Sequence, residues 1–361
     1  MLLADFGADV LKIEPPAGDA TRKWGKSRFG ENGQFTGSFL SLNRNKRGVV
    51  LDLKGNVGRR AARVLIERAD VVIHSFLPKV AERLELDYAH VAQINPRIIH
   101  CAISGFGLNG RLKDRPGFDM LLQAFAGHLA ITGEPGRPSV RIGPSSIDLL
   151  TAAHAAFAIL VALRERDRSG IGQTIDASLY QSAIHMIGNH LADYSGSGIV
   201  PGKFGSRFPN MAPYGYFQAS DREFFIGISS DDMWHRFCDE VAEPALARDD
   251  FATNSGRLQH RDLLDAILSP IFRMRTAQEW VNLAVKLSIP ATLIYSIPEV
   301  LAHEQATDFL LDTGIDGVKI PGIPVTLSRT PGVVRRHAPK LGEHSEQVLG
   351  ERILGDVGAQ A

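Results

Sequence analysis

Hydrophobic residues in the first half of the chain follow two alternating spacings. Short segments typical of strands occupy residues 10–13, 71–73, 98–103 and 174–177. Segments with the three-to-four-residue spacing of helices lie between them, the clearest at 57–69 and 149–164. Helices usually supply the long crossovers that parallel strands need, so this alternation predicts an α/β fold with a mostly parallel sheet.

The pattern changes near residue 195. Residues 195–210 are rich in Gly, Ser and Pro and have no hydrophobic period, which indicates either a linker between lobes or a mobile lid. Beyond them, Tyr214–Phe217 and Phe224–Ile228 flank the polar Ser220-Asp221-Arg222 in the manner of a hairpin, and helices follow to about residue 305. The second lobe is therefore predicted to be α+β.

Composition and charge exclude several classes of partner. The 361 residues exceed the usual size of one domain, and 40 basic residues balance 40 acidic ones, so no net positive field exists to hold nucleic acid or an anionic membrane. The two cysteines, Cys101 and Cys238, are too few for a disulfide framework, which favours a reducing cytoplasm. No apolar run approaches the length of a membrane span and the first residues lack a signal-peptide pattern, so a cytoplasmic location is expected.

Three further motifs carry little chemistry by themselves. Gly105, Gly107 and Gly110 have the spacing of a dinucleotide fingerprint, but the charged segment 111–116 ends in proline where an apolar helix should begin, so nicotinamide binding is not expected. Residues 43–47 form a basic cluster that suits phosphate groups and equally suits a solvated loop. The histidines lack zinc-ligand and nucleophile–base spacing, and no metal site is predicted.

Asp148 is the strongest candidate for chemistry that the pattern offers. It follows Pro144-Ser145-Ser146 at the start of a strongly apolar helix. The helix dipole and nearby N–H groups stabilise a carboxylate in the first turn and keep it ionised at neutral pH. An acid that only stabilises the helix satisfies the same pattern, so a catalytic role needs further support.

Support comes from motifs that occur in a fixed order over nearly the whole chain. They occupy residues 3–14 (LADFGADVLKIE), 45–54 (NKRGVVLDLK), 69–76 (ADVVIHSF), 95–99 (NPRII), 104–107 (SGFG), 115–119 (RPGFD), 172–176 (GQTID), 212–214 (APY) and 341–345 (LGEHS). No single motif suffices, but their joint order is specific. On this basis the chain resembles the class III CoA-transferase family, which includes formyl-CoA transferase and the carnitine and bile-acid (CaiB/BaiF) CoA-transferases.

The resemblance implies a fold and an assembly. We expect a Rossmann-like large domain with a parallel sheet, a smaller α+β domain, and two subunits interlocked as a homodimer. Residues 1–195 would form the first part of the large CoA-binding domain, 196–212 a Gly-rich linker, 213–305 the small domain, and 306–361 a C-terminal segment that returns to the large domain. The family's first strand is missing here, so we expect the true start upstream of Met1 and unpaired edges on its two neighbours.

The resemblance also implies roles for individual residues. Asp148 corresponds to the family's nucleophile, which would pass through aspartyl anhydride and aspartyl-CoA thioester intermediates. The substrates would be an acyl-CoA, from which coenzyme A is transferred, and a small carboxylic acid that receives it. No tightly bound cofactor is expected. The family's CoA contacts correspond to Leu51, Asp52, Leu53, Lys54, Ser75, Phe76, Leu77, Arg83, Phe118 and Asp119.

Two departures from the family pattern bear on the reaction. Racemases of the same superfamily carry a proton-transferring His at the position of Phe118, and a phenyl ring cannot exchange a proton, so transfer is favoured over racemisation. Pro15 stands where formyl-CoA transferases place a CoA-contacting Arg, and proline supplies neither charge nor N–H. The alternatives left open are an acyl-CoA racemase or CoA-dependent lyase of the same fold, and a non-catalytic family member or partner subunit.

Overall fold

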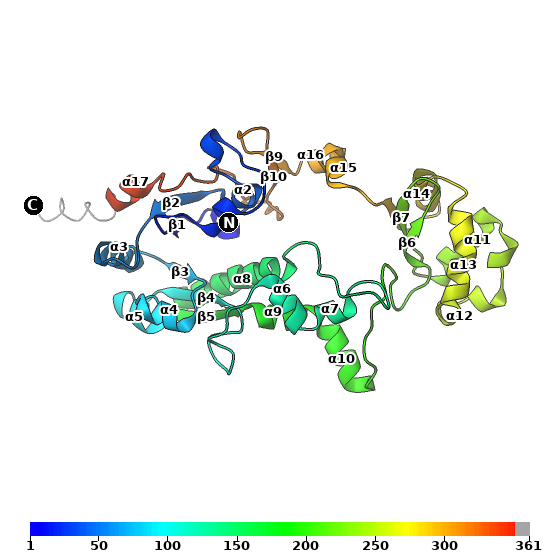
Figure 1. The fold of residues 1–361 in the computed structure, drawn as a ribbon, viewed down its shortest axis with the longest axis horizontal. Coiled ribbons are helices and arrows are strands. Elements are labelled where there is room, and N and C mark those ends of the chain that lie inside the picture. The colour runs from blue at the N-terminus through cyan, green and yellow to red at the C-terminus, as the bar shows by residue number, and fades with distance from the viewer. Residues whose placement is uncertain (351–361) are drawn as a thin grey trace, which may run out of the picture. The chain divides into compact units, whose positions relative to one another are not determined.

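The predicted parallel strands are present in the computed structural model, which describes residues 1–350 (Figure 1). β1 pairs in parallel with β2, and β3, β4 and β5 form a second parallel sheet in that order. A short antiparallel pair, β9 with β10, lies near the end of the chain. The bounds of these strands are Val10–Glu14 (β1), Lys46–Val50 (β2), Val71–His74 (β3), Ile99–Ser104 (β4), Gln173–Ser178 (β5), Leu310–Asp312 (β9) and Lys319–Pro321 (β10).

The parallel strands are divided between two sheets rather than joined in one. Within residues 1–350, β1 pairs with β2 alone and β3 pairs with β4 alone. Each of these two strands therefore has one edge without a strand partner.

Helices connect these strands and, with them, make up the first structural unit, which comprises residues 1–126, 143–187 and 303–361. The longest helix of residues 1–350, α8, packs on β4, β5, α6 and α9. It ends at Gly170, whose left-handed conformation (φ 77°) and N–H bond to the Arg166 carbonyl close the last turn. The helices are Leu2–Asp5 (α1), Gly37–Asn43 (α2), Asn56–Glu67 (α3), Pro78–Arg83 (α4), Tyr88–Ile94 (α5), Asp119–Phe125 (α6), Ser146–Ser169 (α8), Leu179–Met186 (α9), Glu304–Thr307 (α16) and Ser345–Leu349 (α17).

Helix α8 is more apolar than the sequence pattern suggested. An 18-residue window has a mean hydropathy of 1.9, so by length and composition α8 could cross a membrane, and the expectation that no run approaches such a span was wrong. One helix of this kind is weak evidence for a membrane, because core helices pass the same test. Its buried residues Ala155 and Ile159 pack with Cys101 of β4 and Ala177 of β5, and 28% of the apolar window is buried in this structure.

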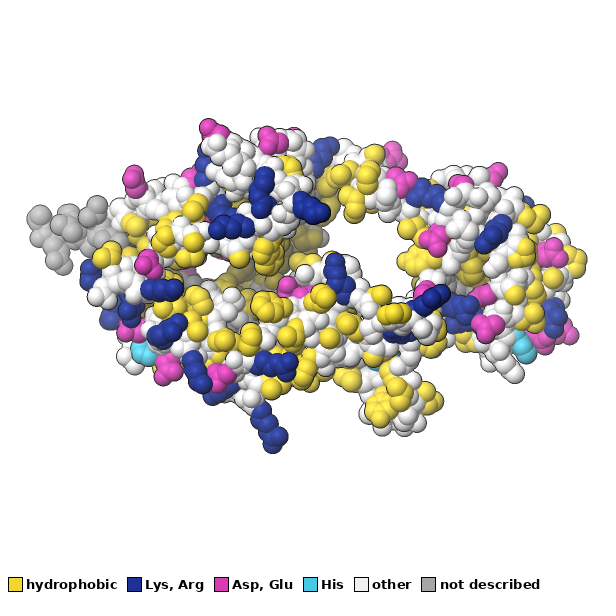
Figure 2. Space-filling view, viewed as in Figure 1, with side chains coloured by type: hydrophobic (Ala, Val, Ile, Leu, Met, Phe, Trp, Pro, Cys, Tyr) yellow, Lys and Arg dark blue, Asp and Glu magenta, His cyan; other side chains and the backbone are white. Residues whose placement is uncertain are grey.

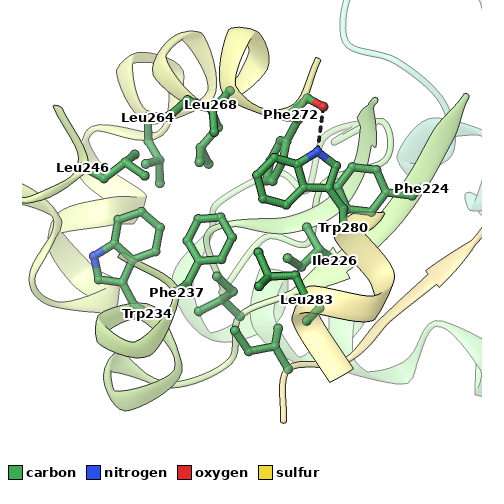
Figure 3. Packing of buried hydrophobic residues seen from close by; sticks show 14 of the residues in the cluster. Phe224, Ile226, Trp234, Phe237, Leu246, Leu264, Leu268, Phe272, Trp280 and Leu283 are labelled. Atoms are coloured by element: carbon green, nitrogen blue, oxygen red, sulfur yellow. Dashed lines mark hydrogen bonds between the residues drawn. The ribbon is translucent and has the colours of Figure 1, made fainter. Parts of the chain in front are cut away.

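The second unit, residues 127–142 and 188–302, contains the predicted hairpin. β6 and β7 are antiparallel, and β8 extends the sheet. Trp234, Phe237, Phe272 and Trp280 pack against this sheet with aliphatic neighbours, and the Trp280 indole N–H donates to the Phe272 carbonyl at 2.7 Å (Figure 3). The elements are His128–Ile131 (α7), Gly188–Ser197 (α10), Tyr214–Gln218 (β6), Glu223–Gly227 (β7), Asp231–Val241 (α11), Asn254–Gln259 (α12), Arg261–Phe272 (α13), Ala277–Lys286 (α14), Ala291–Leu293 (β8) and Ile297–Ala302 (α15).

The two units divide the chain at other places than the domain ranges inferred from the family. Residues 127–142 and 188–195, assigned above to the large domain, lie in the second unit. The C-terminal segment from residue 303 lies in the first unit. Helix α10 reaches into the predicted linker, and residues 198–210 form turns and irregular structure.

The basic cluster at residues 43–47 is part of the interior of the first unit. Arg44 is almost fully buried and donates to both carboxylate oxygens of Asp5, with the shortest bond at 2.8 Å. Asn45 donates to the same carboxylate at 2.8 Å, and Arg47 pairs with Asp9 at 2.6 Å. Arg44 and Arg47 thus already hold carboxylates, so the reading of this cluster as a solvated loop was wrong.

Removing one partner of the Arg44–Asp5 pair should destabilise the protein strongly. We expect Arg44→Ala to lower the free energy of unfolding by about 3–5 kcal/mol, because the Asp5 carboxylate would stay buried without its counter-charge. Urea unfolding followed by circular dichroism measures the change. Arg63→Ala, which removes an exposed pair with Glu67, is the matched control and should cost less than about 1 kcal/mol. Equal effects of the two substitutions would contradict the account.

Candidate active site

Asp148 lies in the first turn of α8, as the sequence predicted, and its side chain is exposed. The residue at the N-cap position is Ser145, but its side chain makes no capping hydrogen bond. The Ser146 hydroxyl is buried and has no hydrogen-bond partner among the described residues. Ser145 and Ser146 therefore leave the first N–H groups of this helix to another acceptor.

That acceptor is the carboxylate of Asp119, the first residue of α6. Its Oδ2 accepts the backbone N–H of Ile147 at 2.8 Å and the backbone N–H of Asp148 at 3.3 Å. Its Oδ1 accepts from the side-chain amide of Gln123 at 2.6 Å. Asp119 is 8% exposed, so three donors satisfy a carboxylate that is nearly enclosed by protein. The start of α8 is thus capped by a side chain of a different helix.

Asp119 also changes the acidity of the candidate nucleophile. Protein atoms around Asp148 remove part of its hydration and raise its pKa, and the nearby Asp119 carboxylate raises that pKa further. The first-turn position alone predicts the opposite direction, because free N–H groups and the helix dipole favour the ionised form. The direction differs because burial, followed by the charge of Asp119, outweighs the effect of the first-turn position.

Two glycines allow Asp119 to approach α8. Gly105 follows β4 and Gly117 precedes α6, and a Cβ built on Gly117 would lie 2.5 Å from the Cα of Gly105. No side chain fits into that space. The motif that resembled a dinucleotide fingerprint therefore contributes a close contact between two backbone segments, which sets the position of Phe118 and Asp119.

The segment predicted to contact CoA after β2 exposes polar side chains. Leu51 is buried in a cluster with Val49 and Ala61, whereas Asp52 and Lys54 are exposed. The Asp52 carboxylate accepts the backbone N–H of Lys54 at 3.0 Å, which fixes the turn that leads into α3. Leu53 is half-buried.

The segment predicted to contact CoA after β3 rests on a pair of histidines. Phe76 donates its backbone N–H to His74 Nδ1 at 3.1 Å, and the two rings stack with centroids 5.4 Å apart. His74 Nε2 lies 3.0 Å from His100 Nε2. Because Nδ1 of His74 accepts a bond, neutral His74 carries its proton on Nε2. His100 Nε2 also lies 3.0 Å from the Leu86 carbonyl oxygen, which can only accept a hydrogen bond. Burial, followed by the proximity of His100, lowers the pKa of His74 to about 4.

The remaining residues predicted to contact CoA differ in their exposure to solvent. Phe118 is 71% exposed beside Asp119, Arg83 is exposed at the end of α4, Ser75 is exposed, and Leu77 is half-buried. The structure brings Asp119 and Asp148 into direct contact. Sequence reasoning missed the capping role of Asp119 and the His74–His100 pair. An acidic first residue of α6 and a His at the end of β3 were visible signals, but neither indicated its partner.

Comparisons with known proteins identify the family. The family model for CoA-transferase family III covers residues 1–345. The chain is 35% identical to a succinate–glutarate CoA-transferase of Agrobacterium fabrum (97% of this chain, 90% of the relative) and 35% identical to an acetyl-CoA:oxalate CoA-transferase of Acetobacter aceti (97% and 90%). A crystal structure of a CaiB/BaiF family protein from Brucella suis superposes with a TM-score of 0.89 at 33% identity, covering 97% of this chain and 93% of that one.

The chain therefore belongs to CoA-transferase family III. It is a CoA-transferase, an enzyme that transfers coenzyme A to a carboxylic acid, and its mixed α/β fold with parallel sheets is that of the CaiB/BaiF proteins. The family, the fold class and the transferase activity expected from the sequence are confirmed.

The buried His74 should make stability depend on pH. Below about pH 6.5 the unfolded chain protonates this histidine, whereas the folded protein keeps it neutral until the pH approaches 4. The contribution of neutral His74 to the free energy of unfolding is therefore complete above about pH 6.5 and is lost as the pH falls towards 4. We expect a loss on the order of 2–3 kcal/mol across this window. His74→Gln should abolish this part of the dependence in urea unfolding, whereas His235→Gln, at an exposed position, should not. The same pH dependence in wild type and His74→Gln would exclude the assignment.

Proposed function

We propose that Asp148 is the nucleophile that carries CoA between two carboxylic acids. The observation that supports it most strongly is an exposed first-turn carboxylate whose own backbone N–H is held by the buried Asp119. Such an arrangement fixes the backbone of the nucleophile while its side chain stays open to substrate. A raised pKa also makes the Asp148 carboxylate a stronger nucleophile than an ordinary carboxylate.

In the first half of the reaction, the Asp148 carboxylate attacks the thioester carbonyl of the donor acyl-CoA and CoA leaves as the thiolate. The product is an anhydride between Asp148 and the donor acid. The thiolate then attacks the aspartyl carbonyl, which releases the donor carboxylate and leaves an aspartyl-CoA thioester. The thioester bond is thus conserved on the enzyme.

In the second half, the acceptor carboxylate attacks the aspartyl-CoA thioester and releases the CoA thiolate. The thiolate attacks the acceptor acyl carbonyl of the new anhydride, which yields acceptor acyl-CoA and regenerates the Asp148 carboxylate. Because every step exchanges one acyl bond for another of similar energy, the reaction needs water exclusion more than it needs strong acid or base. No tightly bound cofactor takes part in this scheme.

The substrates that we propose are a dicarboxylic acyl-CoA, such as succinyl-CoA, as donor and a small carboxylic acid as acceptor. The names of several relatives support this choice, because they pair succinate or succinyl-CoA with glutarate, citramalate or mesaconate. The presence of Phe118 supports transfer over racemisation, because a phenyl ring cannot take part in proton exchange.

We further propose that the enzyme acts as an interlocked homodimer in the cytoplasm. The face of α8 opposite to its buried stripe carries exposed apolar side chains, including Phe157 at 69% and Leu160 at 57% exposure. Figure 2 shows hydrophobic side chains gathered over the part of the surface near α6, α8 and α9. A soluble monomer rarely exposes such a group of apolar side chains, and a second subunit would cover it.

The two cysteines support the proposed cytoplasmic location. Burial raises the pKa of Cys101 to about 11 and of Cys238 to about 12, which suits thiols that stay reduced.

Charges placed on the exposed face of α8 should weaken the dimer. We expect Phe157→Asp combined with Leu160→Asp to shift the mass measured by light scattering from dimer towards monomer, because two carboxylates would have to be desolvated at the interface. Val57→Asp, at an isolated exposed residue of α3, is the control and should leave the mass unchanged. A dimeric mass for the double variant would show that α8 is not at the interface.

Removal of the Asp148 carboxylate should abolish CoA transfer. We expect Asp148→Ala and Asp148→Asn to lower kcat by about 10³-fold or more while leaving the circular dichroism spectrum unchanged. The assay presents a panel of free acids with succinyl-CoA, acetyl-CoA or formyl-CoA as donor, and detects the new acyl-CoA. Asp167→Asn, at the other end of α8, is the matched control and should retain activity. Turnover by a folded Asp148→Ala protein would exclude Asp148 as the nucleophile.

A further inference from the structure

Asp119 occupies a position in which a carboxylate is costly. It lies beside an apolar cluster that contains Leu122, Ala126 and Ile147, and it is 8% exposed. Transfer of a charged group into such surroundings is unfavourable unless hydrogen bonds compensate for the lost hydration. The three donors described above supply that compensation.

A neutral cap for α8 was available nearby and is not used. Ser145 occupies the N-cap position, yet its side chain accepts no hydrogen bond from the helix. Serine is among the preferred N-cap residues, and its hydroxyl can satisfy a first-turn N–H without introducing a charge. The chain instead places a full negative charge next to the one carboxylate in this turn that is exposed to substrate.

We propose that Asp119 is a positioning residue that holds the backbone of the nucleophile Asp148 and sets the charge around its side chain, rather than a contact for CoA. Both of its oxygens are already engaged by protein donors. This inference rests on the proposed role of Asp148. It differs from the assignment of Asp119 to the CoA site that the family resemblance implied.

The electrostatic part of the proposal depends on few groups. From α6, the charge that acts on Asp148 is that of Asp119, and it adds to the effect of burial in raising the pKa of Asp148. Of the titratable residues on the neighbouring elements β5 and α9, Asp176 and His185 line a cavity with His154, further along α8. The third, Tyr180, packs its ring against Phe106 and Phe125. Loss of the Asp119 charge should therefore lower the pKa of Asp148.

The decisive variant is Asp119→Asn, which keeps the size of the side chain and an oxygen that accepts from the helix, but removes the charge. The pH dependence of kcat/KM for succinyl-CoA falls on its acid side where Asp148 becomes protonated. We expect the acid limb of Asp119→Asn to move to lower pH than in wild type. A purely structural residue would not move it. Asp87→Asn, which alters the N-cap carboxylate of α5, is the control and should leave the acid limb in place.

Asp119→Ala separates positioning from binding of CoA. Loss of the cap should lower kcat by about 10²-fold, the usual consequence of a nucleophile displaced by about 1 Å, and leave KM for succinyl-CoA unchanged. A raised KM with unchanged kcat, or an unmoved acid limb in Asp119→Asn, would overturn the proposal and return Asp119 to the CoA site. If Asp148→Ala is inactive, such a result contradicts only the role of Asp119. If Asp148→Ala remains active, the proposed function itself fails.

Discussion

The geometry of the candidate site depends on the hydrogen bonds that the Asp119 carboxylate accepts from the first turn of α8. These bonds join α6 to α8, whose first N–H groups would otherwise lack these partners. They also fix the direction in which the Asp148 side chain leaves the backbone. The close contact of Gly105 with Gly117 brings Asp119 to this position, so the loop after β4 and the start of α6 act together.

Buried charges recur in the first unit, and each has a defined partner. Arg44 holds Asp5, Arg22 holds Glu14 at 2.8 Å, and Asp119 holds backbone N–H groups. Breaking such an arrangement is costly, because the remaining charge stays away from water. The ion pairs connect the N-terminal strand and the C-terminal segment, whereas Asp119 serves the turn that carries the nucleophile. Pairing of buried charges thus stabilises the fold at Arg44 and Arg22 and, at Asp119, it positions the candidate nucleophile.

Sequence reasoning predicted the features that depend on local pattern. The strands β1, β3, β4 and β5, the β6–β7 hairpin and the helix that starts beside Asp148 were all anticipated, because hydrophobic period and turn residues are local signals. The features that it missed join residues far apart in the chain. Asp119 and Ile147 are 28 residues apart, His74 and His100 are 26 apart, and Asp5 and Arg44 are 39 apart. No periodic pattern encodes such pairs. For this reason neither the buried partners of the basic cluster nor the contact of Asp119 with the turn of Asp148 could be predicted from the sequence.

The covalent role of Asp148 is the central claim, and peptide mass analysis during turnover tests it most directly. Cleavage after Arg141 and Arg164 releases residues 142–164, in which Asp148 is the only acidic side chain. After incubation with succinyl-CoA and trapping with hydroxylamine or borohydride, the account predicts a modified 142–164 peptide in wild type and an unmodified one in Asp148→Asn. An unmodified 142–164 peptide from wild-type enzyme that is turning over would contradict it.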